Sequence, residues 1–445
     1  MTGASLARAL VEGGLQPSEH DGKVRLFDLV LERHTTVGSS SRAPVRAWWV
    51  PGRLEVFGKH TDYAGGRTLV CAVPRGFAVT ASGRDDGILN IIDARNNEGV
   101  TLRPPFEEVF TGWRNYVRVV ARRLSRNFPE SAFGADIVFA SDLPRASGMS
   151  SSSALMISIA TVLVRQGTLE AREEWRANIR APLDSAGYYA CIENGLSFGS
   201  LRGDSGVGTH GGSEDHAAIL TAQPGRLSAF RFVPMRPDAT CRVPDQWRFL
   251  LAPSGVPSEK TGAAKERYNR LSLGTRALLE HWNRTEPHAE SLGAALGSRP
   301  DAARQLREIV RCSATGDWTP DALTNRLDHF VREDARVPDA LAAFDAADGA
   351  RLQELATGSQ EDAETLLENQ VPATVQLARS ARSSIARMRR SLRHAGVPTR
   401  SSRCRDRRWW SCLLPNCRPG LQTRRAFAAS CISRARTRAA RMRRV

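Results

Sequence analysis

Five ionisable side chains are concentrated in one short stretch between two glycine-containing turns. The stretch spans residues 51–66 and reads PGRLEVFGKHTDYAGG, with Arg53, Glu55, Lys59, His60 and Asp62. Apolar residues lead into it and out of it, so it is predicted to be a polar loop that connects two strands or buried segments and faces a polar ligand. A charged hairpin on the protein surface is the alternative interpretation of the same pattern.

A second candidate site is a run of small residues between an apolar strand and an apolar helix. The run comprises Gly148, Met149, Ser150, Ser151, Ser152 and Ser153. The first N–H groups of a helix are free to bind phosphate oxygens, and small side chains let an anion approach the backbone. Serine hydroxyls add hydrogen bonds or ligate Mg²⁺. Phosphate binding is therefore the favoured interpretation, and a helix that is only capped by serine is the alternative.

A carboxylate and a histidine follow the most glycine-rich part of the chain. Residues 195–212 read GLSFGSLRGDSGVGTHGG and lead to Ser213, Glu214, Asp215 and His216. Glycines allow the backbone and a ligand to come close together, so this segment suits a site. Asp215 is the candidate general base, and His216 is expected to have a structural or surface role. A flexible surface loop is the alternative.

The apolar periodicity around these stretches predicts an α/β fold. Residues 112–128 have the spacing of an amphipathic helix, and residues 168–194 are expected to form a helix broken near Pro182. The segments 77–81 and 88–92 are expected to form a β-hairpin. Further strands are expected at residues 43–50, 135–140, 226–233 and 246–252. From residue 262 onward the pattern is almost entirely helical, so the second part of the chain is predicted to be mainly α.

Charge and cysteine are concentrated in the last 46 residues. Residues 400–445 contain 14 arginines and one acid, so they carry +13 of the net charge of +16 and leave +3 for the rest of the chain. Four of the eight cysteines also lie there, without a C-x-x-C pair or a histidine, so a zinc site is not expected. The longest uncharged apolar run has 11 residues, too short to span a bilayer. We expect a cytoplasmic protein that does not bind a membrane, and nucleic-acid binding only if this basic tail is genuine.

Four of these stretches resemble the motifs of one family. PGRLEVFGKHTDYAGG resembles the first signature of galactokinases, usually written PGRVNLIGEHTDYNGG, and GWRNYVRVV resembles a helix of the same family. LPRASGMSSSSA resembles the phosphate loop of the GHMP small-molecule kinase superfamily, which includes homoserine, mevalonate and phosphomevalonate kinases. GTHGGSEDH resembles the galactokinase segment that carries the catalytic aspartate. The likeness covers about residues 43–375, with the motifs in the family order.

The resemblance implies a fold with two α/β lobes and an active site between them. Residues 1–42 are then an N-terminal extension, residues 43–235 the N-terminal lobe, residues 236–395 the mainly helical C-terminal lobe, and residues 396–445 a divergent tail. The implied reaction is ATP-dependent phosphorylation of a sugar hydroxyl, which in galactokinases is on the anomeric carbon. ATP and Mg²⁺ are the implied cofactors, and a small sugar is the implied partner.

The resemblance also assigns roles to residues. Asp215 would orient or remove the proton of the attacking hydroxyl, and Arg53 would keep Asp215 ionised and stabilise charge as the phosphoryl group moves. The remaining roles are sugar binding by Lys59, His60, Asp62 and Tyr268, metal binding by Ser152 and Glu193, and phosphate binding by residues 148–153.

Three departures from the family pattern carry predictions. Lys59 replaces a glutamate that contacts a sugar hydroxyl in galactokinases, which favours a modified sugar such as a uronic acid over plain galactose. Ala146 and Ser147 replace glycines of the phosphate loop, and both are small enough to be tolerated. The last family motif, a glycine-rich loop, is missing from the arginine- and cysteine-rich tail, which indicates a lost reading frame and an impaired enzyme.

Two other functions remain open from the residues alone. One is a different kinase of the superfamily, such as an arabinokinase. The other is a protein that senses sugar and ATP without turnover.

Overall fold

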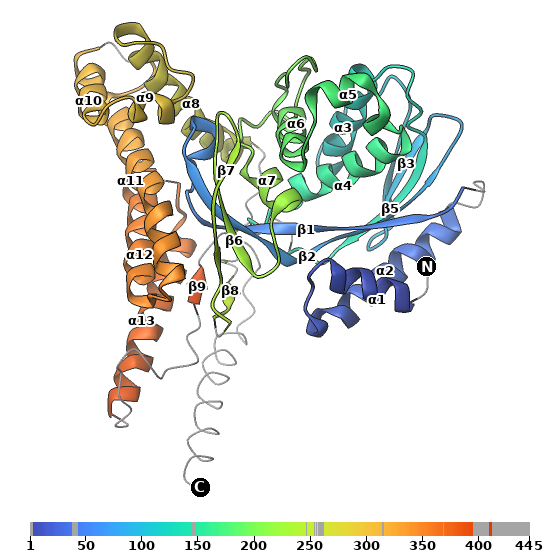
Figure 1. Cartoon of the computed structure of the whole chain (residues 1–445), viewed down its shortest axis with the longest axis horizontal. Helices are drawn as coiled ribbons and strands as arrows, with labels where there is room; N and C mark the ends of the chain where they lie inside the picture. The colour runs from blue at the N-terminus through green and yellow to red at the C-terminus, as the bar shows by residue number, and fades with distance from the viewer. Residues whose placement is uncertain are drawn as a thin grey trace, which may run out of the picture.

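A seven-stranded mixed sheet organises the first part of the protein (Figure 1). The computed structural model describes residues 3–37, 43–144, 148–245, 247–252, 254, 256, 262–313, 316–367, 369–394 and 409–411. The strands run in the order β4 (Glu98–Leu102), β3 (Leu89–Asp93), β5 (Ala135–Ser141), β2 (Arg67–Gly83), β6 (Arg226–Arg231) and β7 (Arg236–Arg242), and β1 (Arg46–Phe57) pairs with β2. The pair β3–β5 is parallel and the other pairs of this sheet are antiparallel.

The two long strands β1 and β2 carry the charged stretch. Their register shifts between Pro51 and Arg53, where the strand pairing is irregular. Proline has no N–H to donate to the neighbouring strand, so a strand tolerates proline where its pairing is irregular. The strand β1 includes residues 51–57, and the loop is limited to residues 58–66, which lead directly into β2. Thr61 and Asp62 in this loop are buried, which the surface-hairpin alternative does not explain.

Helices cover both faces of the sheet. One face carries α3 (Trp113–Asn127), α4 (Ser151–Gln166), η2 (Leu169–Ala171), α5 (Glu173–Asn178), α6 (Pro182–Asn194) and α7 (Glu214–Thr221). The other carries α1 (Gly3–Glu12) and α2 (Pro17–Val37), which lie below the sheet in Figure 1. Neighbouring residues of β2 divide between the two layers, since Ala78 packs with α1 and α2 and Val79 packs with α3 and α4. This is the alternation of side chains expected along a strand.

The structure corrects one prediction and refines others. The segments 77–81 and 88–92 do not form a hairpin, because β5 lies between β2 and β3. The local sequence pattern predicted both strands, but it did not predict that β5, from later in the chain, lies between them. The break near Pro182 is present, since α5 ends at Asn178 and α6 begins at Pro182. The N-terminal residues belong to the folded layer, where the ring of His34 hydrogen-bonds the hydroxyls of Thr80 and Ser82.

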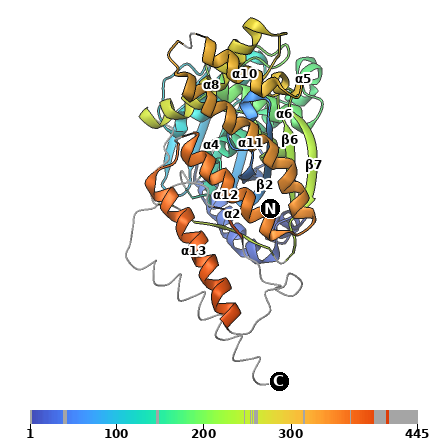
Figure 2. The same cartoon turned by 90° about the vertical axis from the view of Figure 1, so that its left-hand side faces the viewer.

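The second part of the chain is mainly helical. It contains α8 (Gly262–Thr285), α9 (Leu292–Gly297), α10 (Ala302–Cys312), α11 (Pro320–Asp345), α12 (Gly349–Thr365) and α13 (Pro372–His394), with β8 (Phe249–Leu251) before them. Figure 2 shows α11, α12 and α13 in front of the sheet when the protein is viewed from this side. Val337 and Phe344 of α11 pack in one apolar cluster with Leu54 of β1 and Leu69 of β2. The helical part is thus joined to the two strands that carry the charged stretch.

Two sequence predictions fall on residues whose structure is not described. Ala146 and Ser147 of the phosphate loop lie outside the described residues, as does most of the tail after residue 394. Within the tail, β9 (Trp409–Ser411) pairs in parallel with β8. The part of the chain that the structure describes contains no helix with the length and apolar character needed to cross a membrane.

Candidate active site

The charged stretch and the aspartate after the glycine-rich segment meet in an ion pair. Arg53 of β1 donates from Nε to Oδ1 of Asp215 at 2.6 Å, and its Nη2 lies 2.5 Å from the same oxygen. Its Nη1 donates to the carbonyl oxygen of Gly148 at 2.7 Å. Burial opposes the charge of Arg53, but the carboxylates of Asp215, Glu214 and Glu55 outweigh it and raise the pKa of the guanidinium. Arg53 is therefore a fixed cation between Asp215 and the start of the serine run.

The serine run joins the same centre through Ser153. Its hydroxyl lies 3.0 Å from Oε2 of Glu193 and 3.2 Å from Oδ2 of Asp215, and its single hydrogen can serve one of them at a time. Ser153 is almost fully buried in the first turn of α4, and Glu193 lies at the end of α6. Two carboxylates and a hydroxyl therefore converge at the N-terminus of α4.

Ser152 points elsewhere. Its hydroxyl hydrogen-bonds Tyr116 of α3, whose pKa is raised to about 12 by burial and by the nearby charge of Glu193. Consecutive helical residues are turned by about 100° from each other, and Ser153 is the serine of this pair whose hydroxyl hydrogen-bonds Glu193. The structure brings the Ser153 hydroxyl to Glu193, and the metal role expected for Ser152 stays a prediction.

The N-terminus of α4 has the properties of an anion site. The helix begins at Ser151, after Gly148 and Ser150, which both have positive φ angles. The first N–H groups of a helix have no partner within it, and they carry the positive end of its dipole. Met149 is buried instead, and its carbonyl oxygen accepts the Arg53 N–H at 3.4 Å. With Met149 buried, the glycine and the serines of the run 148–153 are the residues that can line the site.

The loop of residues 58–66 forms the other side of the site. Oδ2 of Asp62 accepts the N–H of Glu214 at 3.1 Å, so the loop contacts the residue beside Asp215. Burial raises the pKa of Asp62, and the nearby charge of Asp215 adds to this effect. Gly212 packs on the same carboxylate so closely that a Cβ atom there would lie 1.7 Å from Oδ2. A glycine is therefore required at position 212 while Asp62 holds its place.

His60 and Tyr268 complete this side. Their ring centroids are 5.8 Å apart, and Nε2 of His60 lies 3.1 Å from Nδ2 of Asn369. Burial raises the pKa of Tyr268 well above its usual value, and the charges of Asp62 and Asp215 act in the same direction. Tyr268 comes from α8, so the helical part of the chain contributes directly to the site.

Two carboxylates of the site, Glu55 and Glu214, were given no role from the sequence. Burial raises the pKa of Glu55 to about 7, partly offset by Arg53 and Lys59, and its Oε1 has no hydrogen-bond partner among the described residues. Glu214 accepts a hydrogen bond from Nη2 of Arg53 at 3.0 Å, and burial, reinforced by Glu55, raises its pKa. Glu55 could have been found from strand alternation, because residues 53 and 55 of a strand point to the same face.

The remaining two candidate residues, Lys59 and His216, differ in their burial. Lys59 is partly exposed and acts on Glu55 through its charge, without a direct ion pair among the described side chains. His216 is buried, with Nε2 3.5 Å from Oε2 of Glu193, so its position fits a structural role behind the site.

A separate cavity lies at the far end of α4. It has a volume of about 650 Å³ and is lined by residues that include Arg46, Trp48, Arg165 and Gln166. The helix rises about 1.5 Å per residue, so this cavity lies roughly 20 Å from Ser153 along α4. It is therefore distinct from the site built on Arg53 and Asp215.

Comparison with known proteins places these elements in a family. A model of the galactokinase galactose-binding signature matches residues 33–83, and a model of the GHMP kinase N-terminal domain matches residues 115–185. A galactokinase from Actinobacillus pleuropneumoniae serotype 3 is 27% identical over 341 residues, which are 76% of this chain and 79% of that protein. The chain is a galactokinase-like GHMP kinase. Over a shorter region, 31% of this chain and 35% of the relative, a Glaesserella parasuis galactokinase is 37% identical over 138 residues.

Solved structures agree on the fold. The crystal structure of Lactococcus lactis galactokinase complexed with galactose matches with a TM-score of 0.62 and 20% sequence identity, over 79% of this chain and 82% of that one. The predicted mixed α/β fold of the galactokinase-like kinases is thereby confirmed. The two family models include the loop 58–66 and the serine run, whereas Asp215 and the helices from α8 onward lie outside them.

Proposed function

We propose that this protein is an ATP-dependent sugar kinase that transfers the γ-phosphoryl group of ATP to galactose or a close relative. The observation that carries the proposal is the contact of Arg53 with Asp215 at 2.6 Å, between the N-terminus of α4 and the loop 58–66. One side of this ion pair presents helix N–H groups suited to phosphate, and the other presents side chains suited to hydroxyls. A reaction that joins a sugar hydroxyl to a phosphoryl group needs these two surfaces to face each other.

In this mechanism Asp215 accepts a hydrogen bond from the attacking hydroxyl and orients it toward the phosphorus atom. Arg53 holds Oδ1 of the Asp215 carboxylate, and the Ser153 hydroxyl lies 3.2 Å from Oδ2, the oxygen that we assign to the attacking hydroxyl. The same guanidinium stabilises the negative charge that spreads over the transferred group. His60, Asp62 and Tyr268 would bind the other sugar hydroxyls.

The oxygen donors beside α4 suit a divalent metal that accompanies ATP. Magnesium binds oxygen atoms, and it usually takes only one or two carboxylates together with phosphate oxygens and water. Glu193 provides such a carboxylate, with a serine hydroxyl 3.0 Å away. We assign Mg²⁺ to Glu193 and the serine run, where it would neutralise charge on the phosphates.

A panel of sugars with Mg-ATP and a readout of ADP tests the proposal. Galactose or a near relative should be phosphorylated, and Asp215→Asn should lower kcat by about 10²- to 10⁴-fold, the usual contribution of a positioned proton acceptor. ATP should raise the melting temperature of the variant as it does for the parent protein. If sugar and ATP raise the melting temperature of the parent protein but no ADP forms, the protein is a binding protein and not a kinase.

The same panel tests a second candidate, a kinase for a uronic acid. Lys59 favours this candidate, because an ammonium group donates hydrogen bonds and attracts carboxylates. Glu55, however, stands where the galactokinase signature has asparagine, so the site retains a carboxylate acceptor near Lys59. Faster phosphorylation of galacturonate than of galactose would establish the second candidate, and the reverse order would exclude it.

A further inference from the structure

The helix α11 makes direct contacts with the backbone of the loop that carries the sugar-side residues. Glu333 accepts the N–H of Gly58, Asp334 accepts the N–H of Arg67, and Arg326 donates to the carbonyl oxygen of His60. Glu333 and Asp334 are adjacent and lie seven and eight positions, or about two turns, after Arg326. The helix therefore contacts the main chain of the loop at Gly58 and His60, and again at Arg67, which directly follows the loop.

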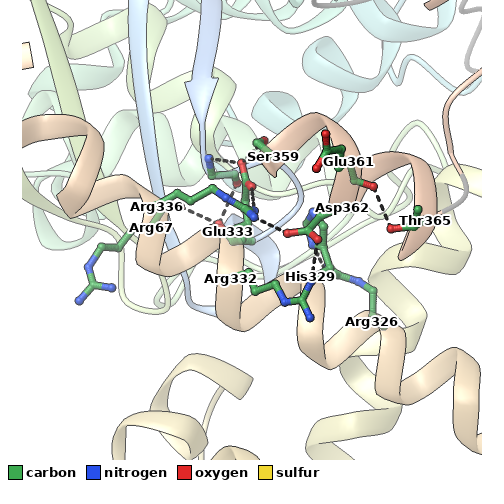
Figure 3. A network of polar contacts seen from close by, with 12 residues as sticks. Arg67, Arg326, His329, Arg332, Glu333, Arg336, Ser359, Glu361, Asp362 and Thr365 are labelled. Atoms are coloured by element: carbon green, nitrogen blue, oxygen red, sulfur yellow. Dashed lines mark hydrogen bonds and ion pairs between the residues drawn. The ribbon is translucent and has the colours of Figure 1, made fainter. Parts of the chain in front are cut away.

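Glu333 is the most enclosed of these contacts. Its side chain is fully buried, and Oε1 accepts the Gly58 N–H at 3.1 Å and the Ser359 hydroxyl at 3.0 Å. Its other oxygen accepts a hydrogen bond from Nη1 of Arg336 at 2.8 Å. Figure 3 shows this carboxylate between Arg336 and Ser359, where α11 and α12 face each other. A buried carboxylate with all these donors is held in one orientation, because losing any of them leaves a polar group unpaired.

Arg326 and Asp334 hold the rest of the loop. Nη2 of Arg326 donates to the His60 carbonyl oxygen at 2.5 Å and to the Tyr63 hydroxyl at 3.0 Å. Oδ1 of Asp334 accepts the Arg67 N–H at 2.7 Å, and its other oxygen pairs with the Arg67 guanidinium. The hydrogen bonds to Gly58, His60 and Arg67 go to main-chain atoms, so they fix the path of the backbone.

The loop needs such support because its backbone is unusual. Gly58 has a φ of +97°, and a Cβ atom there would lie 2.3 Å from the Arg67 carbonyl oxygen. His60 has a φ of +60°, which is uncommon for a residue with a side chain. The Thr61 hydroxyl lies 2.8 Å from the Gly58 carbonyl oxygen and 2.6 Å from the Arg67 carbonyl oxygen, so its single hydrogen closes the loop through one of them at a time. A strained segment of this kind keeps one shape only where its surroundings determine it.

We propose that Glu333, Arg326 and Asp334 are positioning residues for the sugar, acting through the backbone of residues 58–67. This inference rests on the proposed function for its effect on substrate, but the contacts themselves do not. The loop presents Lys59, His60 and Asp62, whereas the phosphate surface on α4 makes none of these contacts. Loosening the α11 contacts should therefore weaken sugar binding and leave ATP binding unchanged.

The substitution Glu333→Gln tests the inference, with Asp339→Asn as its matched control. Asp339 lies on the same helix and loses the same charge, but its partner is the exposed Arg351 at 2.7 Å. We expect E333Q to raise KM for the sugar about tenfold, the usual effect of one lost charge-assisted hydrogen bond, with KM for ATP changed less than twofold. D339N should leave both values unchanged. A fall in kcat alone, or an equal rise in both KM values, would indicate a structural defect and overturn the inference.

Hydrogen exchange of the protein without ligands gives an answer that does not depend on sugar turnover. Peptides covering residues 57–68 should exchange at least fivefold faster in E333Q than in D339N, because glutamine has one uncharged acceptor oxygen where the carboxylate has two, and it cannot serve both the Gly58 N–H and the Arg336 guanidinium. Equal exchange in the two variants would refute the positioning role, even if the protein proves to be a sugar kinase. Faster exchange in a protein that phosphorylates no sugar would support the contacts and reject the proposed function. Arg326→Lys, which keeps the charge, provides a second variant if E333Q does not fold.

Discussion

Replacing Glu55 by glutamine should make the folded protein less sensitive to rising pH. Burial raises the pKa of Glu55 from its usual 4.5 to about 7, and Arg53 and Lys59 offset only part of that effect. Between these two values the folded protein holds a proton on Glu55 that the unfolded chain has released. The free energy of unfolding of the parent protein therefore falls as the pH rises through this window. Glutamine binds no such proton, so the variant loses this contribution.

The size of the effect follows from the two pKa values. A difference from 4.5 to about 7, at ~1.4 kcal/mol for each pH unit, corresponds to about 3 kcal/mol. Most of this falls between pH 5 and pH 8, because the unfolded carboxyl group is already mostly ionised at pH 5. Glu214 acts in the same direction, since its raised pKa depends partly on the charge of Glu55.

Urea unfolding of the parent protein and of E55Q at pH 5 and pH 8 measures the effect. Relative to the parent, E55Q should gain about 2 to 3 kcal/mol of unfolding free energy between these two pH values. Glu354→Gln serves as the control, because Glu354 is an exposed carboxylate on α12 that pairs only with Arg351 among the described residues. Parallel pH profiles for the parent, E55Q and E354Q would refute the argument and show that Glu55 is ionised and solvated at neutral pH.

Two further predictions concern the two sides of the site. Gly212→Ala places a Cβ atom 1.7 Å from Oδ2 of Asp62, so Asp62 must move. We expect the KM for the sugar to rise at least tenfold, with the ATP affinity measured by calorimetry unchanged. An unchanged KM for the sugar would contradict the placement of Asp62. Glu193→Gln removes a charged oxygen ligand, so the Mg²⁺ concentration that gives half the maximal rate should rise about tenfold. An unchanged Mg²⁺ dependence would show that Glu193 is not a metal ligand.

The parts of the site that the sequence indicated are those carried by short motifs. Arg53 and Asp62 could be singled out because charged residues between glycine turns are unusual in a core, and Asp215 because it follows the glycine-rich segment 195–212. The structure then brings them together through a strand pair and the start of α7, with the Asp62 carboxylate on the Glu214 N–H. Glu55 and Glu214 were passed over because each is next to, or two residues from, a more conspicuous candidate. The choice between Ser152 and Ser153 needed the rotation of α4, which a run of identical residues does not reveal.

The parts of the fold that sequence patterns missed depend on long-range pairing. Residues 77–81 and 88–92 are both strands, but β5, more than 40 residues later, separates them. Likewise residues 3–37 form helices whose partners are strands β2 and β5. Alternation and periodicity report which face of a segment is buried, and they do not report which distant segment buries it.

The contacts of α11 are the strongest example of this limit, and they bear on how the substrate is selected. Glu333, Asp334 and Arg326 lie 266 to 275 residues after the loop atoms that they hold, in a helix whose sequence reads as an ordinary charged surface. A charged residue in an amphipathic helix is usually solvated, so no local signal separates the buried Glu333 from the exposed Asp339. Yet the two differ in what they fix. Glu333 holds the main chain just before Lys59, where the loop has a positive charge in place of the glutamate of the galactokinase signature. Together the two proposals predict that the sugar preference depends on the ammonium group at position 59 and on a helix in the other half of the chain that holds the main chain beside it.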